Sequence, residues 1–306
     1  MSIEERGTPA WYDDRLIEAS GVAGQELPAG ALYVVATPIG NVADVTVRAL
    51  WVLSHVDAIA AEDTRTTRTL LDRYGISARG LIAAHEHNER AAAARLLELV
   101  RVGQRVALVT DAGTPAISDP GAAIVRAMQE AGQRVIPVPG ASSVTTLLSA
   151  AGLFGSAFTF IGFLPSGVRE RARRLQSLAH AGEPFVLLEA PHRMIDTARE
   201  LAAALDAERR IVIGRELTKK FESIATTTAA ALPAWIEANP PRGEYVLLID
   251  ALAAPPAPEI DATVLRWLDA LADALPPARA AAVAAKATGL PREPLYERLV
   301  HKNRPR

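Results

Sequence analysis

The chain has 306 residues, of which 49% are hydrophobic and 22% charged, and its formal net charge is -2. This composition is that of an ordinary soluble globular protein, and the length suggests two or three domains. The charge excludes a protein that is basic throughout, so any contact with nucleic acid must use a local basic patch. The absence of cysteine excludes disulfides, thiolate nucleophiles and cysteine-ligated metal sites.

The N-terminal residues 1–29 contain no apolar segment behind a basic start, and no later apolar run reaches the length of a membrane span. We therefore expect a cytoplasmic protein with no membrane partner. The same residues are polar and rich in Gly, Pro and acidic side chains without a sustained periodicity, which predicts a loosely ordered extension.

Short apolar strands alternate with amphipathic helices over residues 30–152. The first strand is predicted at 31–36, and the helix after it spans about 44–54 with Asp44 as its N-cap. The later strands in this part are predicted at 58–61, 81–84, 106–109 and 134–138, and the later helices end near residue 75 or span 90–101, 122–131 and 141–151. Such an alternation predicts an α/β domain with a parallel, doubly wound sheet.

A second α/β domain is predicted over residues 156–251. Its strands are expected at 158–163, 184–188, 211–214 and 245–249, and its helices at 168–180 and 195–205. Residues 252–260 are rich in Ala and Pro and predict a linker. The remaining residues, 261–306, predict a small helical domain, in which helices at 278–287 and 292–299 flank a glycine turn. This pattern fits a helix-turn-helix that contacts nucleic acid or a packed helical hairpin.

The segment VALVTDAGTPAISDPG, residues 106–121, breaks off from a strand into small and polar residues. Ligands of open α/β sheets bind at the carboxyl ends of strands, where small residues let the backbone approach. Asp111, Thr114, Ser118 and Asp119 offer polar contacts there. The alternative is that these residues only form a turn.

Three other groups of polar residues could carry chemistry. Glu62 and Asp63 follow a strand and could act as a base or bind a ribose hydroxyl, or else cap the helix that begins before Arg65. His85 and His87 could bind a metal, but no motif typical of metal sites is present and we expect none. Seven basic residues fall in one predicted domain and could either bind phosphate groups or form a solvated surface. They are Arg169, Arg171, Arg173, Arg174, Arg215, Lys219 and Lys220.

Several segments together resemble one family. In order, they are VATPIGNVADVTVRAL, AAEDTR, VTDAGTPAISDPG, VIPVPGASS, FIGFLP, EAPHR and RELTKKFE. Their order and spacing resemble the ribosomal small-subunit RNA cytidine 2′-O-ribose methyltransferases of the tetrapyrrole-methylase superfamily, over residues 31–250. The tail LPPARAAAVAAKATGLPREPLYERLV is similar to the helix-turn-helix-like tail of that family, which favours RNA contact by residues 261–306.

The resemblance implies a two-domain tetrapyrrole-methylase-like fold, a homodimer and S-adenosylmethionine bound in a cleft between the domains. The cofactor-binding positions that it implies are Pro38, Ile39, Gly40, Asp111, Ala112, Gly113, Thr114, Ile117, Ser142, Ser143 and Glu189. The positions for RNA are Arg193, Arg215 and Lys220. Thr37 to Asn41 replace the Gly-Pro-Gly-Asp of porphyrin-modifying members, and Thr114 replaces their Asp, which disfavours a tetrapyrrole substrate.

The function that follows is 2′-O-ribose methylation of a cytidine in small-subunit (16S) ribosomal RNA, as free RNA or in the assembled small ribosomal subunit. The methyl sulfonium is already reactive, so the protein must mainly align the ribose hydroxyl and assist its deprotonation. Glu62, Asp63 and Glu216 are candidate bases, and Arg65 and Lys219 are candidate electrostatic partners. The alternatives are a tetrapyrrole C-methyltransferase and a non-catalytic RNA-binding assembly factor.

Overall fold

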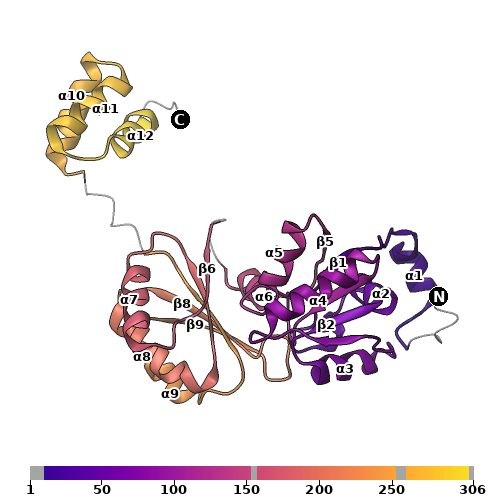
Figure 1. Ribbon diagram of the computed structural model, residues 1–306. Helices are drawn as coiled ribbons and strands as arrows, with labels where there is room; N and C mark the ends of the chain where they lie inside the picture. The colour runs from indigo at the N-terminus through magenta and orange to yellow at the C-terminus, as the bar shows by residue number, and fades with distance from the viewer. Residues whose placement is uncertain (1–9, 153–156, 253–259, 303–306) are drawn as a thin grey trace. The chain divides into compact units, whose positions relative to one another are not determined.

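The computed structural model describes residues 10–152, 157–252 and 260–302 (Figure 1). The chain divides into two compact units, Met1–Leu252 and Ala253–Arg306. In the described ranges, the first unit contains two five-stranded sheets and the helices that cover them, and the second contains three helices. Within the described residues, none of the helices combines the length and the apolar character needed to cross a membrane.

The first sheet contains β1 (Ala31–Val35), β2 (Ala58–Ala61), β3 (Leu81–Ala83), β4 (Arg105–Val109) and β5 (Arg134–Val138). Their order is β3-β2-β4-β1-β5, and each pair is parallel. The side chains of β1 alternate between two hydrophobic clusters, with Tyr33 in one and Leu32 in the other. This alternation shows that both faces of the sheet are covered.

The first sheet is doubly wound, as predicted. One face packs against α2 (Val47–His55) and α3 (Thr64–Arg73). The other face packs against α4 (Glu89–Arg101) and α5 (Ala122–Glu130). The sequence prediction of a parallel α/β domain is confirmed.

The start of α2 differs from the sequence prediction. Asp44 ends a short 3-10 helix, η2 (Val42–Asp44), and the N-cap of α2 is Thr46, whose hydroxyl accepts a hydrogen bond from the Ala49 N–H at 3.1 Å. Both Asp and Thr are good N-caps. The extended backbone of Val45 separates the two turns and leaves Thr46 at the helix start.

The N-terminal segment also differs from the expected loose extension over the residues that the structure describes, 10–29. It contains α1 (Asp14–Ser20) and η1 (Val22–Gly24), and Ile17 and Val22 are buried. Trp11 packs against the core of the first sheet. A helix of two turns is too short to give a sustained periodicity, so the sequence pattern did not reveal it.

The second sheet contains β6 (Thr159–Phe163), β7 (Phe185–Glu189), β8 (Arg210–Arg215), β9 (Ser223–Thr228) and β10 (Tyr245–Ile249), in the order β6-β7-β10-β8-β9. The β6–β7 pair is parallel and the other pairs are antiparallel, so the second α/β domain is built on a mixed sheet. Sequence analysis missed β9, whose threonine-rich sequence has no apolar run, and the short helix α9 (Leu232–Ala238).

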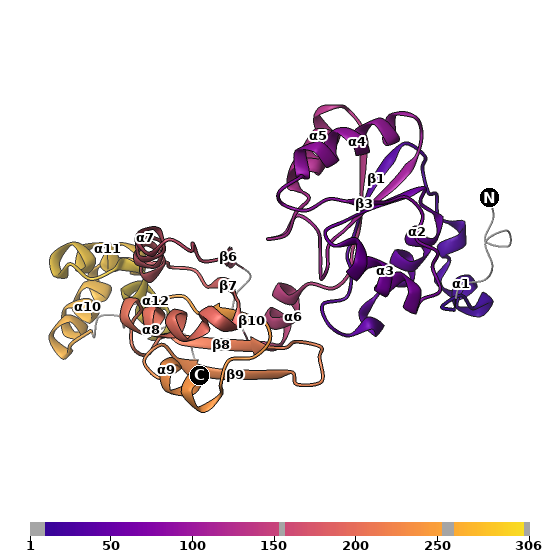
Figure 2. The same cartoon turned by 60° about the horizontal axis from the view of Figure 1, so that its bottom comes forward.

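The two faces of the second sheet pack against different partners. One face is covered by α7 (Val168–Ala179), α8 (Met194–Ala204) and α9. The opposite face packs against Val144 and Leu147 of α6 (Ser143–Ala150), the helix that follows β5. Figure 2 shows α6 beside β10, and the apolar cluster between this helix and the second sheet also includes Ile39 from the loop after β1.

The second unit contains α10 (Ala262–Ala274), α11 (Pro277–Thr288) and α12 (Arg292–Lys302). These helices share a small core that includes Leu268 and Leu295. Gly289 ends α11 with a left-handed backbone (φ 73°), which favours glycine. Most of the predicted linker, residues 253–259, lies outside the described residues, as do residues 1–9 of the predicted extension.

Candidate active site

A cleft of about 420 Å³ lies between the strand ends of the two sheets. This volume lies within the range of small-molecule sites. The first sheet contributes the loops after β1, β4 and β5, and the second contributes β6, β7 and β10. The lining residues are Ile39, Ala112, Gly113, Thr114, Ile117, Asp119, Ser142, Ser143, Val144, Phe160, Phe163, Leu188, Glu189, Ala190, Pro191, Glu244, Tyr245 and Val246.

The loops after β1 and β4 form one wall of the cleft. Thr37 and Gly113 exchange two backbone hydrogen bonds, of 2.9 and 3.1 Å. Gly113 has a φ of +83°, and a Cβ added there would lie 3.4 Å from Cγ2 of Ile39. A side chain at this position is therefore strained and would extend among the groups that line the cleft.

The rest of the β4 loop is held in an unusual conformation. Ala116 (φ 67°) and Ser118 (φ 62°) adopt the left-handed region although neither is glycine. The carboxylate of Glu89 on α4 accepts the N–H groups of Gly121 and Ala123, both at 2.8 Å, and so anchors the end of the loop. Strained backbone of this kind persists where the surroundings fix it, and it is frequent at ligand sites.

Three carboxylates line the cleft: Asp119, Glu189 and Glu244. Burial, the largest cause, acts together with the nearby charges of Glu62, Asp111 and Glu244 to raise the pKa of Asp119 to about 7. Negative charge is thus crowded at one end of the cleft. A cation bound there is stabilised electrostatically and lowers the pKa of Asp119.

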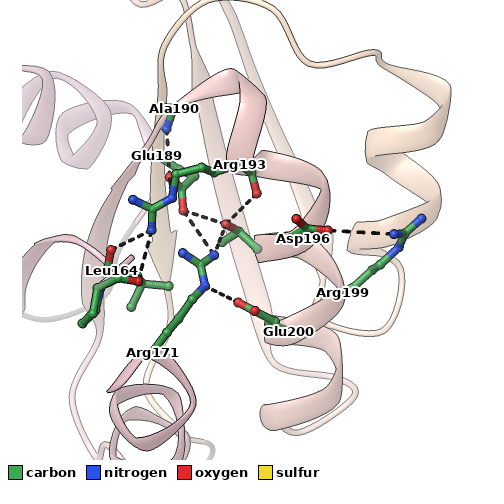
Figure 3. A network of polar contacts seen from close by, with 10 residues as sticks. Leu164, Arg171, Glu189, Ala190, Arg193, Asp196, Arg199 and Glu200 are labelled. Atoms are coloured by element: carbon green, nitrogen blue, oxygen red, sulfur yellow. Dashed lines mark hydrogen bonds and ion pairs between the residues drawn. The ribbon is translucent and has the colours of Figure 1, made fainter. Parts of the chain in front are cut away.

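Glu189 differs from Asp119 because its carboxylate is fully partnered (Figure 3). One oxygen accepts the Ala190 N–H at 3.0 Å and pairs with Nε of Arg193 at 3.2 Å. The other accepts the hydroxyl of Thr197 at 2.6 Å and pairs with Arg171 at 3.5 Å. With a side chain only 1% exposed, Glu189 fixes the cleft wall after β7 through its partners.

The two arginines of this network depart from the sequence expectations. Arg171 belongs to the predicted basic helix, yet it is buried and also bonds Glu200 and Thr197. Arg193 was expected to bind RNA, but its guanidinium pairs with Glu189 and donates to the carbonyl oxygen of Leu164 at 2.6 Å. Both charges are used inside the domain because Glu189 is buried beside them.

Glu62, Asp63 and Asp111 meet where the adjacent strands β2 and β4 end. The carboxylate of Glu62 accepts the Asp111 N–H at 3.3 Å, and that of Asp111 accepts the Asp63 N–H at 3.2 Å. Asp63 caps α3 through the Arg65 N–H at 2.8 Å, which confirms the capping interpretation. Hydrogen bonds from Arg65 lower the pKa of Asp63 to about 2, while the Arg65 side chain is 90% exposed.

Glu216 and Lys219 both contact Glu244, which lines the cleft. Nζ of Lys219 contacts Glu216 at 2.9 Å and Glu244 at 3.1 Å, and the Glu244 N–H donates to Glu216 at 3.0 Å. Burial alone raises the pKa of Glu216, but hydrogen bonds from Lys219 and the Glu244 N–H outweigh it and lower the pKa. A Cβ on Gly40 would lie 2.4 Å from Cγ of Lys219, so glycine is required there.

Most of the predicted cofactor positions line the cleft: Ile39, Ala112, Gly113, Thr114, Ile117, Ser142, Ser143 and Glu189. Pro38, Gly40 and Asp111 line a neighbouring hollow of about 380 Å³ instead. Sequence reasoning noted Asp119 only as a polar residue of the loop and missed Glu244. No local pattern marks Glu244, because antiparallel pairing of β10 with β7 and β8 brings it to the cleft.

The remaining predicted residues lie away from the cleft lining. Arg215 donates Nε to the Arg242 carbonyl at 3.0 Å, and Lys220 is exposed. The rings of His85 and His87 are 6.0 Å apart, but no group of three potential metal ligands occurs in the part of the chain that the structure describes.

Comparison with known proteins identifies the family to which the chain is similar. Residues 31–233 match the family described as Tetrapyrrole (Corrin/Porphyrin) Methylases, and residues 258–302 match a domain described as RsmI C-terminal HTH domain. The chain is 42% identical over 270 residues to the Ribosomal RNA small subunit methyltransferase I of Pasteurella multocida, covering 88% of this chain and 96% of the relative. For the protein of the same name in Pseudomonas aeruginosa, the identity is 44% over 279 residues, covering 90% and 99%.

Solved structures share the fold. Uroporphyrin-III C-methyl transferase from Thermus thermophilus, complexed with S-adenyl homocysteine, matches with a TM-score of 0.51 and 17% identity. The match covers 71% of this chain and 96% of that chain. At this identity, the similarity shows the fold alone.

Proposed function

The chain belongs to the tetrapyrrole methylase family and, within it, to the ribosomal RNA small subunit methyltransferases I, and on that premise we propose how it works. It is a methyltransferase of small-subunit ribosomal RNA. The donor that we propose is S-adenosylmethionine, and the acceptor is the ribose 2′-oxygen of a cytidine in 16S RNA. We place this activity in the cytoplasm, in a homodimer that acts on the small ribosomal subunit or its RNA.

The observation that carries the proposal is the cleft between the two sheets. Its volume of about 420 Å³ suits a nucleoside-sized ligand, and Gly113, which has no side chain, lets a ligand approach the main chain of the β4 loop closely. Asp119 and Glu244 add negative charge, which suits a donor with a positive sulfonium. The residues of the cleft therefore fit this cofactor.

In this proposal the cleft residues named above bind the donor, and Asp119 and Glu244 complement its positive charge. When bound, the donor supplies an electrophilic methyl group. Glu189 keeps the wall after β7 in place through Arg171 and Arg193 rather than by lending its charge to a ligand. Lys219 holds Glu244 at the cleft by an ion pair.

Glu62 is the acid that we propose as acceptor of the ribose proton. It is close enough to Asp119 to raise the pKa of that residue, which places it near the acidic end of the cleft. The other candidate bases are engaged: Asp63 with the α3 N-terminus and Arg65, and Glu216 with Lys219. The side chain of Glu62 accepts only the Asp111 N–H from the described residues. A positioned base of this kind contributes about 100- to 10,000-fold to rate.

The test is transfer of a tritiated methyl group to three acceptors: small ribosomal subunits that lack the modification, free 16S RNA and uroporphyrinogen. We expect label on ribose 2′-oxygen of a cytidine in RNA. Glu62→Gln is expected to lower kcat with little change in affinity for the donor. Label on uroporphyrinogen alone, or donor binding without label in any RNA, contradicts the proposal.

A further inference from the structure

The connection between β8 and β9 presents an aromatic side chain to solvent. Phe221 is 68% exposed, and Nζ of Lys220 lies 5.5 Å from the centre of its ring. A large apolar ring is usually buried. A ring that is exposed beside a cation has the two features with which proteins hold single-stranded nucleic acid, a stacking surface and a positive charge.

This hairpin borders a groove that leads toward the cleft. A hollow of about 570 Å³ is lined by Gly40, Asn41, Val42, Arg73, Thr218, Lys219 and Lys220. The hollow of about 380 Å³ described above shares Gly40, Val42 and Arg73 with it and extends to Pro38 and Asp111. We call the two together the Arg73 groove. Its far end adjoins the cleft, because Pro38 and Asp111 each precede a residue that lines the cleft.

The cations along the Arg73 groove differ in their availability. Lys219 is neutralised by Glu216 and Glu244. The side chains of Arg73 and Lys220, by contrast, form no ion pair or hydrogen bond with the residues that the structure describes, and both are exposed. Lys220 beside the exposed ring and Arg73 in the same hollow as Lys220 are thus two uncompensated cations, which complement a phosphate backbone whose bases are free to stack.

We propose that a single-stranded segment of the substrate RNA lies along the Arg73 groove, with one base stacked on Phe221 and its phosphates on Arg73 and Lys220. This assignment rests on the proposed function and names the RNA subsite of the same enzyme. A duplex does not fit the chemistry, because its bases are stacked on each other and cannot reach the ring. The segment enters at the hairpin, and its ribose reaches the cleft past Gly40.

The first test varies Phe221 in the full-length protein. Phe221→Ala and Phe221→Leu are expected to raise the KM for unmodified small ribosomal subunits by about 5- to 150-fold, the range for loss of one stacked base. Phe221→Trp retains stacking and is expected to stay close to the unsubstituted protein. Val102→Ala, at a side chain that is 75% exposed on the first sheet's domain, serves as the matched control.

The second test uses salt. Removing a phosphate contact lowers the slope of log affinity against log salt by about 0.7 for single-stranded nucleic acid. Arg73→Ala and Lys220→Ala are each expected to show this change, and the double variant twice as much. The affinity of each variant for S-adenosylmethionine, measured by calorimetry, is expected to stay unchanged.

The outcomes separate this proposal from the proposed function. If Phe221→Ala and Arg73→Ala methylate subunits with unaltered KM and salt slope, the Arg73 groove is not the RNA subsite, although the enzyme is still an RNA methyltransferase. If Phe221→Ala instead shifts sedimentation toward a monomer, the ring belongs to an interface between copies of the chain and the subsite is overturned. If the unsubstituted protein labels no RNA, the proposed function itself fails.

Discussion

The wall of the cleft on the side of the first sheet is formed by tightly turned loops, whereas the wall on the side of the second sheet is held by a network of buried side chains. In the first wall, Gly113 lines the cleft with a positive φ, and Ala116 and Ser118 of the same loop also have positive φ. In the second, Glu189 uses both carboxylate oxygens on Ala190, Thr197 and two arginines. The contrast teaches that one wall is built to contact a ligand and the other to keep its shape.

The largest effect is expected where the second wall is broken. Glu189→Ala removes the buried carboxylate that Arg171 and Arg193 share and leaves Arg171 with Glu200 as its acidic partner, and removal of one member of a buried ion pair costs roughly 3–5 kcal/mol of folding free energy. Chemical denaturation measures the loss. Arg199→Ala is the control, because Arg199 and Asp196 in the same view (Figure 3) form an exposed pair 4.0 Å apart, worth at most about 1 kcal/mol. Equal losses would show that Glu189 is not a structural anchor.

The first wall is tested by filling it. Gly113→Val is expected to lower the affinity for S-adenosylmethionine by about 100-fold or more, because the side chain strains the turn and takes ligand space. Gly103→Val is the matched control: its φ of +87° is similar, but no atom lies within 4 Å of an added Cβ. Calorimetry measures both, and retained affinity in Gly113→Val would show that the donor does not sit in this cleft.

The acidic end of the first wall predicts a pH dependence. With the pKa of Asp119 at about 7 in the free protein, a bound cation favours the charged carboxylate, so donor affinity is expected to rise by up to about 10-fold from pH 6 to 8. The folding stability of the free protein changes in the opposite direction. The folded state holds the Asp119 proton more tightly than the unfolded state, so the contribution of Asp119 to stability falls as pH rises toward 7. Asp119→Asn is expected to remove both trends in calorimetry and thermal unfolding.

The smallest expected effects on activity distinguish Lys219 from Arg65, which the sequence analysis gave the same candidate role. Lys219→Ala frees Glu244 from its ion pair and is expected to lower kcat by about 10-fold with a smaller change in donor affinity. Arg65→Ala is expected to lower kcat by no more than about 2-fold, because its side chain is 90% exposed and, among the residues that the structure describes, bonds only its neighbour Asp63. Single-turnover methylation measures both rates. A larger loss of rate for Arg65→Ala than for Lys219→Ala would indicate that the reacting ribose lies closer to the N-terminus of α3.

The sequence by itself determined the parallel sheet and the small, polar loop after β4. These are local consequences of the chain: apolar runs of strand length end in small residues, and parallel strands bring their carboxyl ends to one edge. Ile39, Gly113 and Ser142, which the family resemblance implied as cofactor positions, line the cleft.

Only the tertiary structure decided how the charged residues are used. Arg171 and Arg193 read as free cations in the sequence, but burial of Glu189 between α7 and α8 turns both inward. Glu244 reaches the cleft through antiparallel pairing that no local pattern encodes. The physical reason is that the state and role of a charge depend on its partners and its solvent exposure, and both are set by residues distant in the chain.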